Sequence, residues 1–482
     1  MMKCKSINEI RHDLDNDIVN SLDLFNESVL KAKKYQSDYN SFVTILDDYQ
    51  HIDNKESILN GIPYALKDNV STKGILTTAS SNILKDYVPV YDATIYKMLK
   101  EAGAVLMGKT VLDELAMGGT GTTGHTGIVR NPYDKNRMIG GSSAGSASAV
   151  ALGIVPYAIG SDTGDSIRKP AAYGGVVGFK PSYGRISRYG LFAFASSLDH
   201  LGVLTSNVTD AAIVVDAVKG YDSNDMTSLR DEDIKYADNL NNDVRGKKLF
   251  YIKEVMDVDT DNAELGKIVA NFKEVIKKCE KLGMSVTEVS VNKDLLKAIY
   301  PTYITLSCAE ATSNNANLTG IIYGIRGDKA NINEMMMDAR TKGFSELIKR
   351  RFILGSYILQ RENQEKLYLN ACRVRRMITS LMNDLFKEYD GLILPAAASV
   401  APLFGVNKDK LSDEYLIMDN HLAIGNFGGY PSITIPCGFV SNMPIGVNIT
   451  SGFMEDSKVL NIAYMLESTM EYKQMIVGEE DV

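Results

Sequence analysis

The first apolar residues of the chain recur at helical spacing. Ile10, Leu14 and Ile18 each follow the previous one by four positions. Residues at this spacing share one face of an α-helix, and that face can pack against the body of a protein. Residues 7–49 are therefore predicted to form two amphipathic helices.

Beyond residue 60, short apolar runs alternate with further helical patterns. Strands are predicted at 62–70, 104–107, 155–159, 248–252, 285–291, 391–394, 432–436 and 445–449. Helices are predicted at 92–102, 143–152, 208–218, 263–282 and 458–466, with a short helix opening at Ser166. Strands that alternate with helices predict an α/β fold, in which helices cover the faces of a sheet.

Residues 295–387 interrupt this alternation, because their pattern is mainly helical. They are interpreted as a substrate-covering layer inserted before the last strands. No shift in composition divides the chain, and no tract is repeated or low in complexity. Residues 1–482 are therefore interpreted as a single domain, with N-terminal helices within residues 1–60.

Composition places the 482-residue chain among globular proteins, with 45% hydrophobic and 23% charged residues. Its formal net charge of −8 argues against nucleic-acid binding by this chain alone, because phosphate binding depends on clustered Lys and Arg. The N-terminus shows no apolar signal segment, and the longest largely apolar run, 149–159, is too short to span a bilayer. A cytoplasmic location is expected.

Cysteine and histidine show no binding pattern. The five cysteines are scattered without a CxxC pair, and the five histidines form no HxH or HExxH string. Disulfide scaffolds and metal sites need such spacings. We therefore expect neither a disulfide framework nor a metal site.

Three segments carry residue types suited to nucleophilic catalysis. They are 61–69 with Lys67, 140–146 with Ser142, and 160–170 with Ser166. A hydroxyl nucleophile needs a base to take its proton and N–H groups to hold the developing oxyanion. Glycine-rich turns present N–H groups, and a lysine can be the base when burial keeps it neutral.

These three segments resemble the signature of the amidase signature family. The resemblance implies a Ser–cis-Ser–Lys triad, with Ser166 as nucleophile, Ser142 as bridging serine and Lys67 as base. It also implies the family's α/β fold, with a large, mixed, mostly parallel sheet covered by helices. A cis peptide bond is expected at Gly141–Ser142 or at Ser142–Ser143.

The same resemblance assigns the oxyanion hole to backbone N–H groups of Thr163, Gly164, Asp165 and Ser166. Asp165 departs from the family pattern, which has glycine before the nucleophile. A carboxylate that pointed into the hole would oppose the developing negative charge. We expect the Asp165 side chain to turn away and find a donor, and glycine at this position to raise activity. Arg168 and Asp162 are expected to form an ion pair that braces the turn.

Further segments narrow the resemblance to one branch of the family: 183–190, 192–199, 349–355 and 436–439. Members of this branch release ammonia from glutamine for transamidation of mischarged Glu-tRNA(Gln), within a heterotrimer that has B-type and C-type subunits. The resemblance implies that tRNA, ATP and Mg²⁺ are bound through the partner, and that this chain needs no cofactor. A stand-alone amidase for another small amide, and a non-catalytic paralogue that keeps the partner interface, are the alternatives.

The branch pattern also implies residues that bind glutamine. By this resemblance Arg351 binds the α-carboxylate of glutamine, with the neighbouring Arg350 as an alternative. Asp419 and Tyr303 bind the α-ammonium. An arginine fork suits a carboxylate, and a carboxylate suits an ammonium.

Three other segments match well-known sequence motifs, but the secondary structure predicted around each segment does not fit its motif. Residues 103–110 match the P-loop string, but their middle reads as a strand, and 119–124 match GxGxxG without a preceding strand. Residues 141–145 match the nucleophile elbow of α/β hydrolases, for which His421 could serve, but no strand is predicted before them. The first is interpreted as a buried strand and the second as a loop that lines a substrate pocket.

Overall fold

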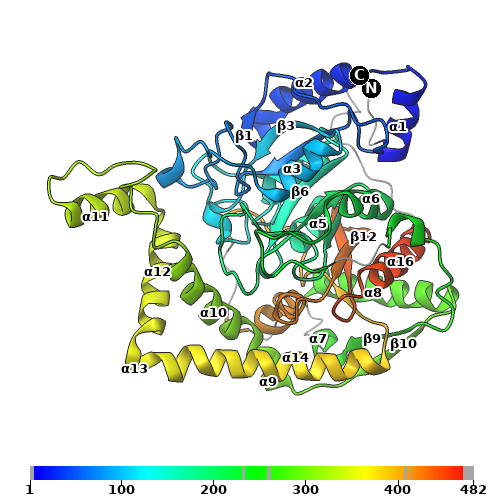
Figure 1. Cartoon of the computed structure of the whole chain (residues 1–482). Coiled ribbons are helices and arrows are strands. Elements are labelled where there is room, and N and C mark those ends of the chain that lie inside the picture. Colours follow the sequence, from blue (N-terminus) through cyan, green and yellow to red (C-terminus); the bar gives the residue numbers. More distant parts are fainter. Residues whose placement is uncertain (1–4, 231–233, 258–261, 407–409, 413, 471–482) are drawn as a thin grey trace.

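The structure is a computed structural model that describes residues 5–230, 234–257, 262–406, 410–412 and 414–470. A large twisted sheet runs through the middle of the molecule, and helices lie on both sides of it (Figure 1). The expected α/β fold is confirmed. Within the described residues, no helix combines the length and apolarity needed to cross a bilayer.

The main sheet has eleven strands. From one edge to the other they are β1 (Phe42–Ile45), β3 (Val105–Thr110), β2 (Pro63–Lys67), β6 (Tyr157–Asp162), β8 (His200–Thr205), β7 (Val177–Lys180), β12 (Ser432–Val440), β13 (Met443–Thr450), β11 (Gly391–Pro395), β9 (Lys248–Ile252) and β10 (Ser285–Val289). Strands from the first and last parts of the chain therefore meet at the centre, where β7 pairs with β12.

The sheet is mixed, but the expectation that most of it is parallel is wrong. Parallel pairing joins β2 to β3 and β6, and joins β9 to β10 and β11. The other neighbouring pairs described are antiparallel, because β1, β7, β8, β12 and β13 run against their neighbours. The alternation of predicted strands and helices missed β1, β7 and β8, and each of these adds antiparallel pairing.

The N-terminal region contains the two expected helices, α1 (Ile7–Asp15) and α2 (Ser21–Tyr39). A capping box, in which Ser6 and Glu9 exchange hydrogen bonds, fixes the start of α1. The prediction that helices fill residues 7–49 is wrong at its end, because Phe42–Ile45 forms the edge strand β1.

Six helices of the α/β body lie close to the predicted ones: α3 (Thr94–Glu101), α4 (Ala144–Ala151), α5 (Arg168–Gly174), α6 (Val208–Val218), α8 (Ala263–Lys281) and α16 (Asp456–Glu467). Two short helices, α7 (Lys253–Met256) and α9 (Lys293–Lys297), were not predicted individually. Helix α4 is buried along its whole length. A side chain at Gly145 would come within 2.2 Å of the Ser41 carbonyl oxygen, so small residues let α4 lie directly against the sheet.

The predicted helical layer is confirmed. It consists of α10 (Ile299–Asn314), α11 (Ile332–Gly343), α12 (Glu346–Leu359), α13 (Arg361–Gln364) and α14 (Asn370–Glu388). Helix α10 packs against α12 and α14, and this layer lies to one side of the sheet in Figure 1. The short helix α15 (Ile424–Phe427) then leads into β12.

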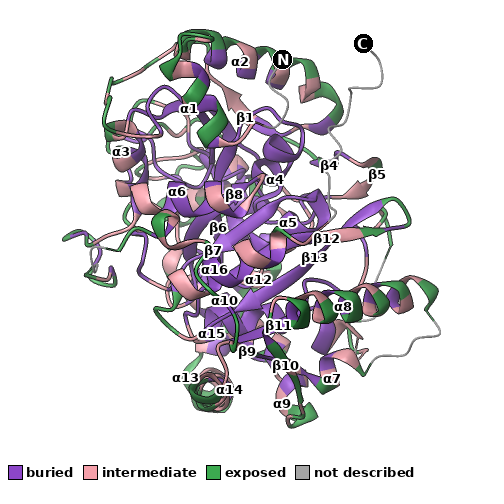
Figure 2. Cartoon of the chain, turned by 90° about the vertical axis from the view of Figure 1, so that its right-hand side faces the viewer, coloured by how far each residue is buried: buried purple, intermediate pink, exposed green. Residues whose placement is uncertain are grey.

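The central strands are the most deeply buried part of the chain. Every residue of β2, β3, β6, β7, β8, β11 and β13 is buried. Figure 2 shows β6, β7, β8 and β13 in the buried colour. By contrast α8 and α14 expose one face to solvent. Polar side chains at the ends of β2 and β6 are therefore held in a dry environment.

Candidate active site

Lys67 is the last residue of β2 and is fully buried. Its ammonium nitrogen lies 2.8 Å from the Ser142 hydroxyl and 2.9 Å from the Ser143 hydroxyl. It also lies 2.9 Å from the Ser161 hydroxyl and 3.1 Å from the Ser161 carbonyl oxygen. Sequence reasoning paired Lys67 with Ser142, and the structure brings them together.

Ser142 lies in the turn that leads into α4. The Gly141–Ser142 peptide bond is cis, so the expected cis bond is confirmed at the first of the two positions named. A side chain at Gly141 would come within 2.0 Å of an Asp113 carboxylate oxygen, so only glycine fits there. That carboxylate accepts hydrogen bonds from the N–H groups of residues 120–123, which wrap around it.

Burial lowers the pKa of Lys67 to about 7. The negative charges of Asp162, Asp113 and Asp199 act in the opposite direction and raise it. Within the described residues, Lys67 has no ion pair that would hold it charged. A lysine in this state can exchange a proton near neutral pH.

The hydrogen bonds around Lys67 limit which hydroxyls can donate to it. The Ser143 hydroxyl can donate to the Ser161 carbonyl oxygen at 3.0 Å, so its own hydrogen has an acceptor. The Ser161 hydroxyl accepts from the Asn69 amide at 3.0 Å. When Lys67 is neutral, the Ser142 hydroxyl can donate its hydrogen to the amine, and so can the Ser161 hydroxyl.

Ser166 follows β6 in a tight turn and is buried. Its carbonyl oxygen accepts from the Ser143 N–H at 3.1 Å, which ties the two serine turns together. The helix expected to open at Ser166 begins two residues later, at Arg168. Within the described residues the N–H groups of Gly164, Asp165 and Ser166 have no hydrogen-bond acceptor in the protein.

The expected ion pair between Arg168 and Asp162 is confirmed, and both side chains are fully buried. Arg168 also donates to the Gly164 carbonyl at 2.8 Å and to the Asn426 side-chain oxygen at 2.7 Å. Burial would raise the pKa of Asp162, but the Arg168 guanidinium holds it well below its usual range. The buried pair therefore fixes the shape of the turn that carries Ser166.

Asn426 is a member of this network that sequence reasoning missed. Its amide donates to the Asp162 carboxylate at 3.0 Å and to the Asp162 carbonyl at 3.1 Å. It lies in α15, 264 positions after Asp162, and the sequence around it carries no motif. The pairing of β7 with β12 and the contacts of α5 with β12 bring the two regions together.

The Asp165 side chain has a donor, as expected. Its carboxylate forms an ion pair with the Lys169 ammonium, one helical turn later, at 2.7 Å. The Lys169 ammonium also donates to the carbonyl oxygen of Asp419 at 2.6 Å. Asp165 has therefore found a donor within the site itself.

The residues expected to bind the substrate lie around this turn. The Tyr303 ring covers Gly164 so closely that a side chain there would come within 2.9 Å of it. Burial raises the pKa of Tyr303, and the positive charge of Arg351 partly offsets this. The Asp419 carboxylate accepts from the Ala398 N–H at 3.2 Å and is buried.

Arg351 is the better placed of the two arginines. Its guanidinium lies over the Phe194 ring at 5.5 Å, and its Nη1 is buried without a hydrogen-bond partner. Arg350, by contrast, is exposed on the outer face of α12. A buried guanidinium nitrogen that lacks an acceptor is suited to a substrate carboxylate.

The competing motifs are structural. Residues 105–110 form β3, as expected, and Lys109 is buried 3.5 Å from the Asp68 carboxylate. Its ammonium also donates to the Val70 carbonyl and to the Thr77 hydroxyl. Residues 119–124 form the loop around Asp113. In the elbow string, Ser143 contacts Lys67, whereas His421 bonds the Met418 carbonyl.

The statement that no strand precedes the elbow string is wrong. Residues Asp134–Met138 form β5, which pairs with β4 (Arg130–Asn131) outside the main sheet. This small hairpin carries polar, partly exposed residues and lacks the apolar run by which buried strands are found.

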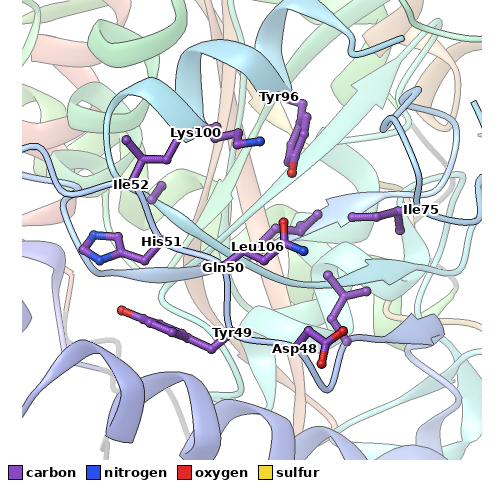
Figure 3. Close-up of a pocket in the computed structure, with 11 residues that line it drawn as sticks. Asp48, Tyr49, Gln50, His51, Ile52, Ile75, Tyr96, Lys100 and Leu106 are labelled. Atoms are coloured by element: carbon purple, nitrogen blue, oxygen red, sulfur yellow. The ribbon is translucent and has the colours of Figure 1, made fainter. Parts of the chain in front are cut away.

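Metal-binding groups and a second cavity bear on where else a ligand could bind. The described residues contain no group of three or more His, Cys, Asp or Glu side chains placed to hold a metal ion. A separate cavity of about 410 Å³ lies between the segment that follows β1 and helix α3, with Tyr96 and Lys100 on the helix side (Figure 3). Neither Lys67 nor either serine of the site lines it.

Comparisons with known proteins agree with this geometry. The model of the amidase family matches residues 23–460. The chain is 39% identical over 473 residues to the A subunit of glutamyl-tRNA(Gln) amidotransferase from Halothermothrix orenii, and the match covers 97% of this chain and 98% of that protein. It is 38% identical over 468 residues to the protein of the same name from Agathobacter rectalis, with 94% and 91% covered. A crystal structure of the corresponding protein from Thermotoga maritima, of the same name, superposes with a TM-score of 0.83 at 34% identity, covering 98% of this chain and 97% of that one.

Proposed function

This chain belongs to the amidase family, and we propose that it hydrolyses glutamine to supply ammonia for the transamidation of mischarged Glu-tRNA(Gln). The observation that carries the proposal is the buried Lys67–Ser142 contact of 2.8 Å beside the turn of Ser166. The names of the similar proteins support a role within an amidotransferase complex.

In the first step Ser166 is the nucleophile. Neutral Lys67 takes the Ser142 hydroxyl proton, and Ser142 takes the Ser166 proton as the Ser166 oxygen bonds to the carboxamide carbon of glutamine. The carbonyl π electrons move to oxygen, and the oxyanion accepts from the N–H groups of residues 163–166. These groups are already oriented, so the charge develops without reorganisation of the site.

In the second step the carbon–nitrogen bond breaks. Lys67 returns its proton through Ser142 to the amide nitrogen, which leaves as ammonia, and the glutamyl group remains as an ester on Ser166. Water then attacks the ester carbon while Lys67 again takes a proton through Ser142. The bond between that carbon and the Ser166 oxygen breaks, Lys67 returns the proton to the Ser166 oxygen, and glutamate is released. Protonated Lys67 is the acid and neutral Lys67 the base, which a pKa of about 7 permits near neutral pH.

Arg351, Asp419 and Tyr303 are proposed to hold glutamine. The unpaired Nη1 of Arg351 takes the α-carboxylate, and the Asp419 carboxylate takes the α-ammonium. Tyr303, which packs on Gly164, closes one side of the space above the oxyanion turn. The distance from these ligands to Ser166 selects the length of the substrate side chain.

The steps of transamidation that follow glutamine hydrolysis are assigned to partner subunits. We propose that a B-type subunit binds the tRNA, ATP and Mg²⁺ and receives the ammonia, and that a small C-type subunit joins the two. The formal charge of −8 of this chain is consistent with tRNA binding by the partner. A cytoplasmic location, where tRNA is charged, is part of the same proposal.

The test is a glutaminase assay of the full chain, alone and with its B-type and C-type partners. Ser166→Ala and Lys67→Ala should each abolish ammonia release and leave thermal unfolding cooperative. Ser146→Ala is the matched control, because Ser146 is a buried serine of α4 that bonds Thr110 and the Ile159 carbonyl instead of Lys67. Near-normal glutaminase activity in Ser166→Ala would overturn the assignment.

The same assay separates the alternatives. Equal hydrolysis of glutamine with and without the partners, or preference for another amide, would support a stand-alone amidase. Partner binding without hydrolysis in the unaltered chain would support a non-catalytic paralogue.

A further inference from the structure

A loop of residues 193–199 contacts both helix α10 and the turn that contains the proposed nucleophile. On the helix side, the Asn314 side-chain amide donates to the Phe194 carbonyl oxygen at 3.2 Å. The Glu310 carboxylate accepts from the Ser197 hydroxyl at 2.6 Å. The helical layer therefore holds this loop from outside.

Asp199 closes the loop from within and also reaches the turn of Ser166. Its carboxylate accepts from the N–H groups of Phe194 at 2.9 Å and of Ala195 at 3.0 Å, and these bonds fix the bend of the loop. The same carboxylate accepts from the Thr163 hydroxyl at 2.7 Å. Thr163 directly follows β6 and begins the turn to which the oxyanion hole is assigned. One carboxylate therefore joins the loop to the turn.

The Asp199 carboxylate is buried, so these hydrogen bonds replace its contacts with water. Burial raises the pKa of Asp199 to about 6, and the hydrogen bonds from Thr163 and Ala195 act in the opposite direction. At pH 8 the group is therefore ionised and can only accept hydrogen bonds. Both the turn and the loop supply the donors that it needs.

The bend of the loop also places the Phe194 ring beside two proposed ligands of glutamine. The ring is buried, and the Arg351 guanidinium lies over it at 5.5 Å. The Tyr303 ring meets it edge to face, with centroids 6.5 Å apart. A guanidinium is attracted to the face of an aromatic ring, so the position of Phe194 influences that of Arg351.

We propose that Asp199 is a positioning residue that sets two parts of the substrate site together. It holds the oxyanion turn through Thr163, and it holds the carboxylate-binding Arg351 through Phe194. Because both connections share one carboxylate, they fix the separation between the oxyanion turn and Arg351. The site is therefore selective for amides whose carboxylate lies at that distance from the carboxamide, and this inference rests on the proposed function.

The experiment separates the two connections with Thr163→Val, Phe194→Leu and Asp199→Ala, and with Asp199→Ala combined with each of the others. The substrates are glutamine and 4-aminobutanamide, which keeps the carboxamide and the ammonium of glutamine but lacks its carboxylate. Steady-state kinetics give kcat and KM for each substrate at pH 8, with the B-type and C-type partners present. At this pH Lys67 is mostly neutral, so the charge of Asp199 has little effect on the rate through the pKa of Lys67.

Thr163→Val should lower kcat about tenfold for both amides and change KM by less than about twofold, because it disturbs only the oxyanion turn. Phe194→Leu should raise KM for glutamine about fivefold and change KM for 4-aminobutanamide by less than about twofold. Asp199→Ala should show both effects. In each double variant the second substitution should change the same constant by less than about twofold, because Asp199→Ala has already broken that connection.

Three results would overturn the inference. They are full additivity in either double variant, an equal rise of KM for the two amides in Asp199→Ala, and unaltered constants in Asp199→Ala. Thermal unfolding of each variant reports loss of the fold. If Asp199→Ala does not fold, Asp199→Asn takes its place, because it keeps one acceptor oxygen and should give smaller losses in the same pattern.

Asp216→Ala is the matched control. The Asp216 carboxylate also accepts from two consecutive N–H groups, those of Tyr236 at 2.8 Å and Ala237 at 2.9 Å, outside the candidate site. This variant should leave kcat and KM unchanged for both amides. If the unaltered complex does not hydrolyse glutamine, the proposed function fails and the inference falls with it. Hydrolysis by the unaltered complex with no effect of Asp199→Ala overturns the inference alone.

Discussion

The protonation of Lys67 should set the pH dependence of glutamine hydrolysis. Burial lowers the pKa of Lys67 to about 7 from its ordinary 10.5. At about 1.4 kcal/mol for each pH unit, this corresponds to about 5 kcal/mol of destabilisation of the charged form. At pH 7 about half of the molecules then hold the neutral base, compared with roughly one in three thousand for an ordinary lysine.

The assay is kcat/KM for glutamine from pH 5.5 to 9.5 at constant ionic strength, with the partners present. Because the reactive form is neutral Lys67, the rate should rise about tenfold for each unit below pH 7 and level off above it. Asp199→Asn removes one of the charges that raise the pKa of Lys67, so its midpoint should move to lower pH.

Three outcomes would refute this reasoning. They are a flat profile between pH 5.5 and 8, a midpoint near 10, and a shift of the Asp199→Asn midpoint to higher pH. Hydrolysis with an unchanged profile in Lys67→Met would show that another group is the base. Urea denaturation of each variant at pH 7 ensures that the rates refer to folded protein.

The remaining predictions concern stability. In urea denaturation at pH 7, Lys109→Met should lower the free energy of unfolding by about 3–5 kcal/mol, because its buried carboxylate partner is left unpaired. Lys67→Met should lower the free energy of unfolding by less, or raise it, because Lys67 has no such partner in the part of the chain that the structure describes. Equal losses in the two variants would contradict this difference in pairing. Arg168→Met should lower the free energy of unfolding by an amount similar to that of Lys109→Met, and adding Asp162→Asn should restore part of this loss. A further loss in the double variant would show that the two residues are not coupled. Burial raises the pKa of Asp210 to about 7. Between about pH 4 and 7 Asp210 is therefore protonated in the folded state and ionised in the unfolded state. The contribution of Asp210 to stability should fall as the pH rises through this window. Asp210→Asn should flatten this part of the Tm–pH curve, and an unchanged slope would contradict the assignment.

Elements with strong local patterns could be predicted from the sequence. The bounds predicted for α6 and β9 are those observed, because each has a strong apolar pattern. By contrast β7 and β8 went unrecognised, and each contains a glycine within its apolar run. Their antiparallel pairing depends on partners far away in sequence, which no local pattern encodes.

The residues of the candidate site also differ in whether the sequence could reveal them. Lys67, Ser142 and Ser166 could be found because each lies in a short string with a recognisable chemical role. Asn426 could not, because its role follows from contacts with a residue 264 positions earlier. The partner of Asp165 could have been found, since Lys169 follows it at the spacing of an ion pair within one helical turn.

The contact between Asp162 and Asn426 has a consequence for protein synthesis. The turn that holds Ser166 takes its shape from Arg168, and Arg168 is anchored by groups in residues 422–432. A ribosome makes Lys67 and the turn of Ser166 long before it makes those anchors. An unfinished chain therefore carries every reactive group in an unassembled state, and hydrolytic capacity should appear only when the last fifth of the protein has emerged and folded.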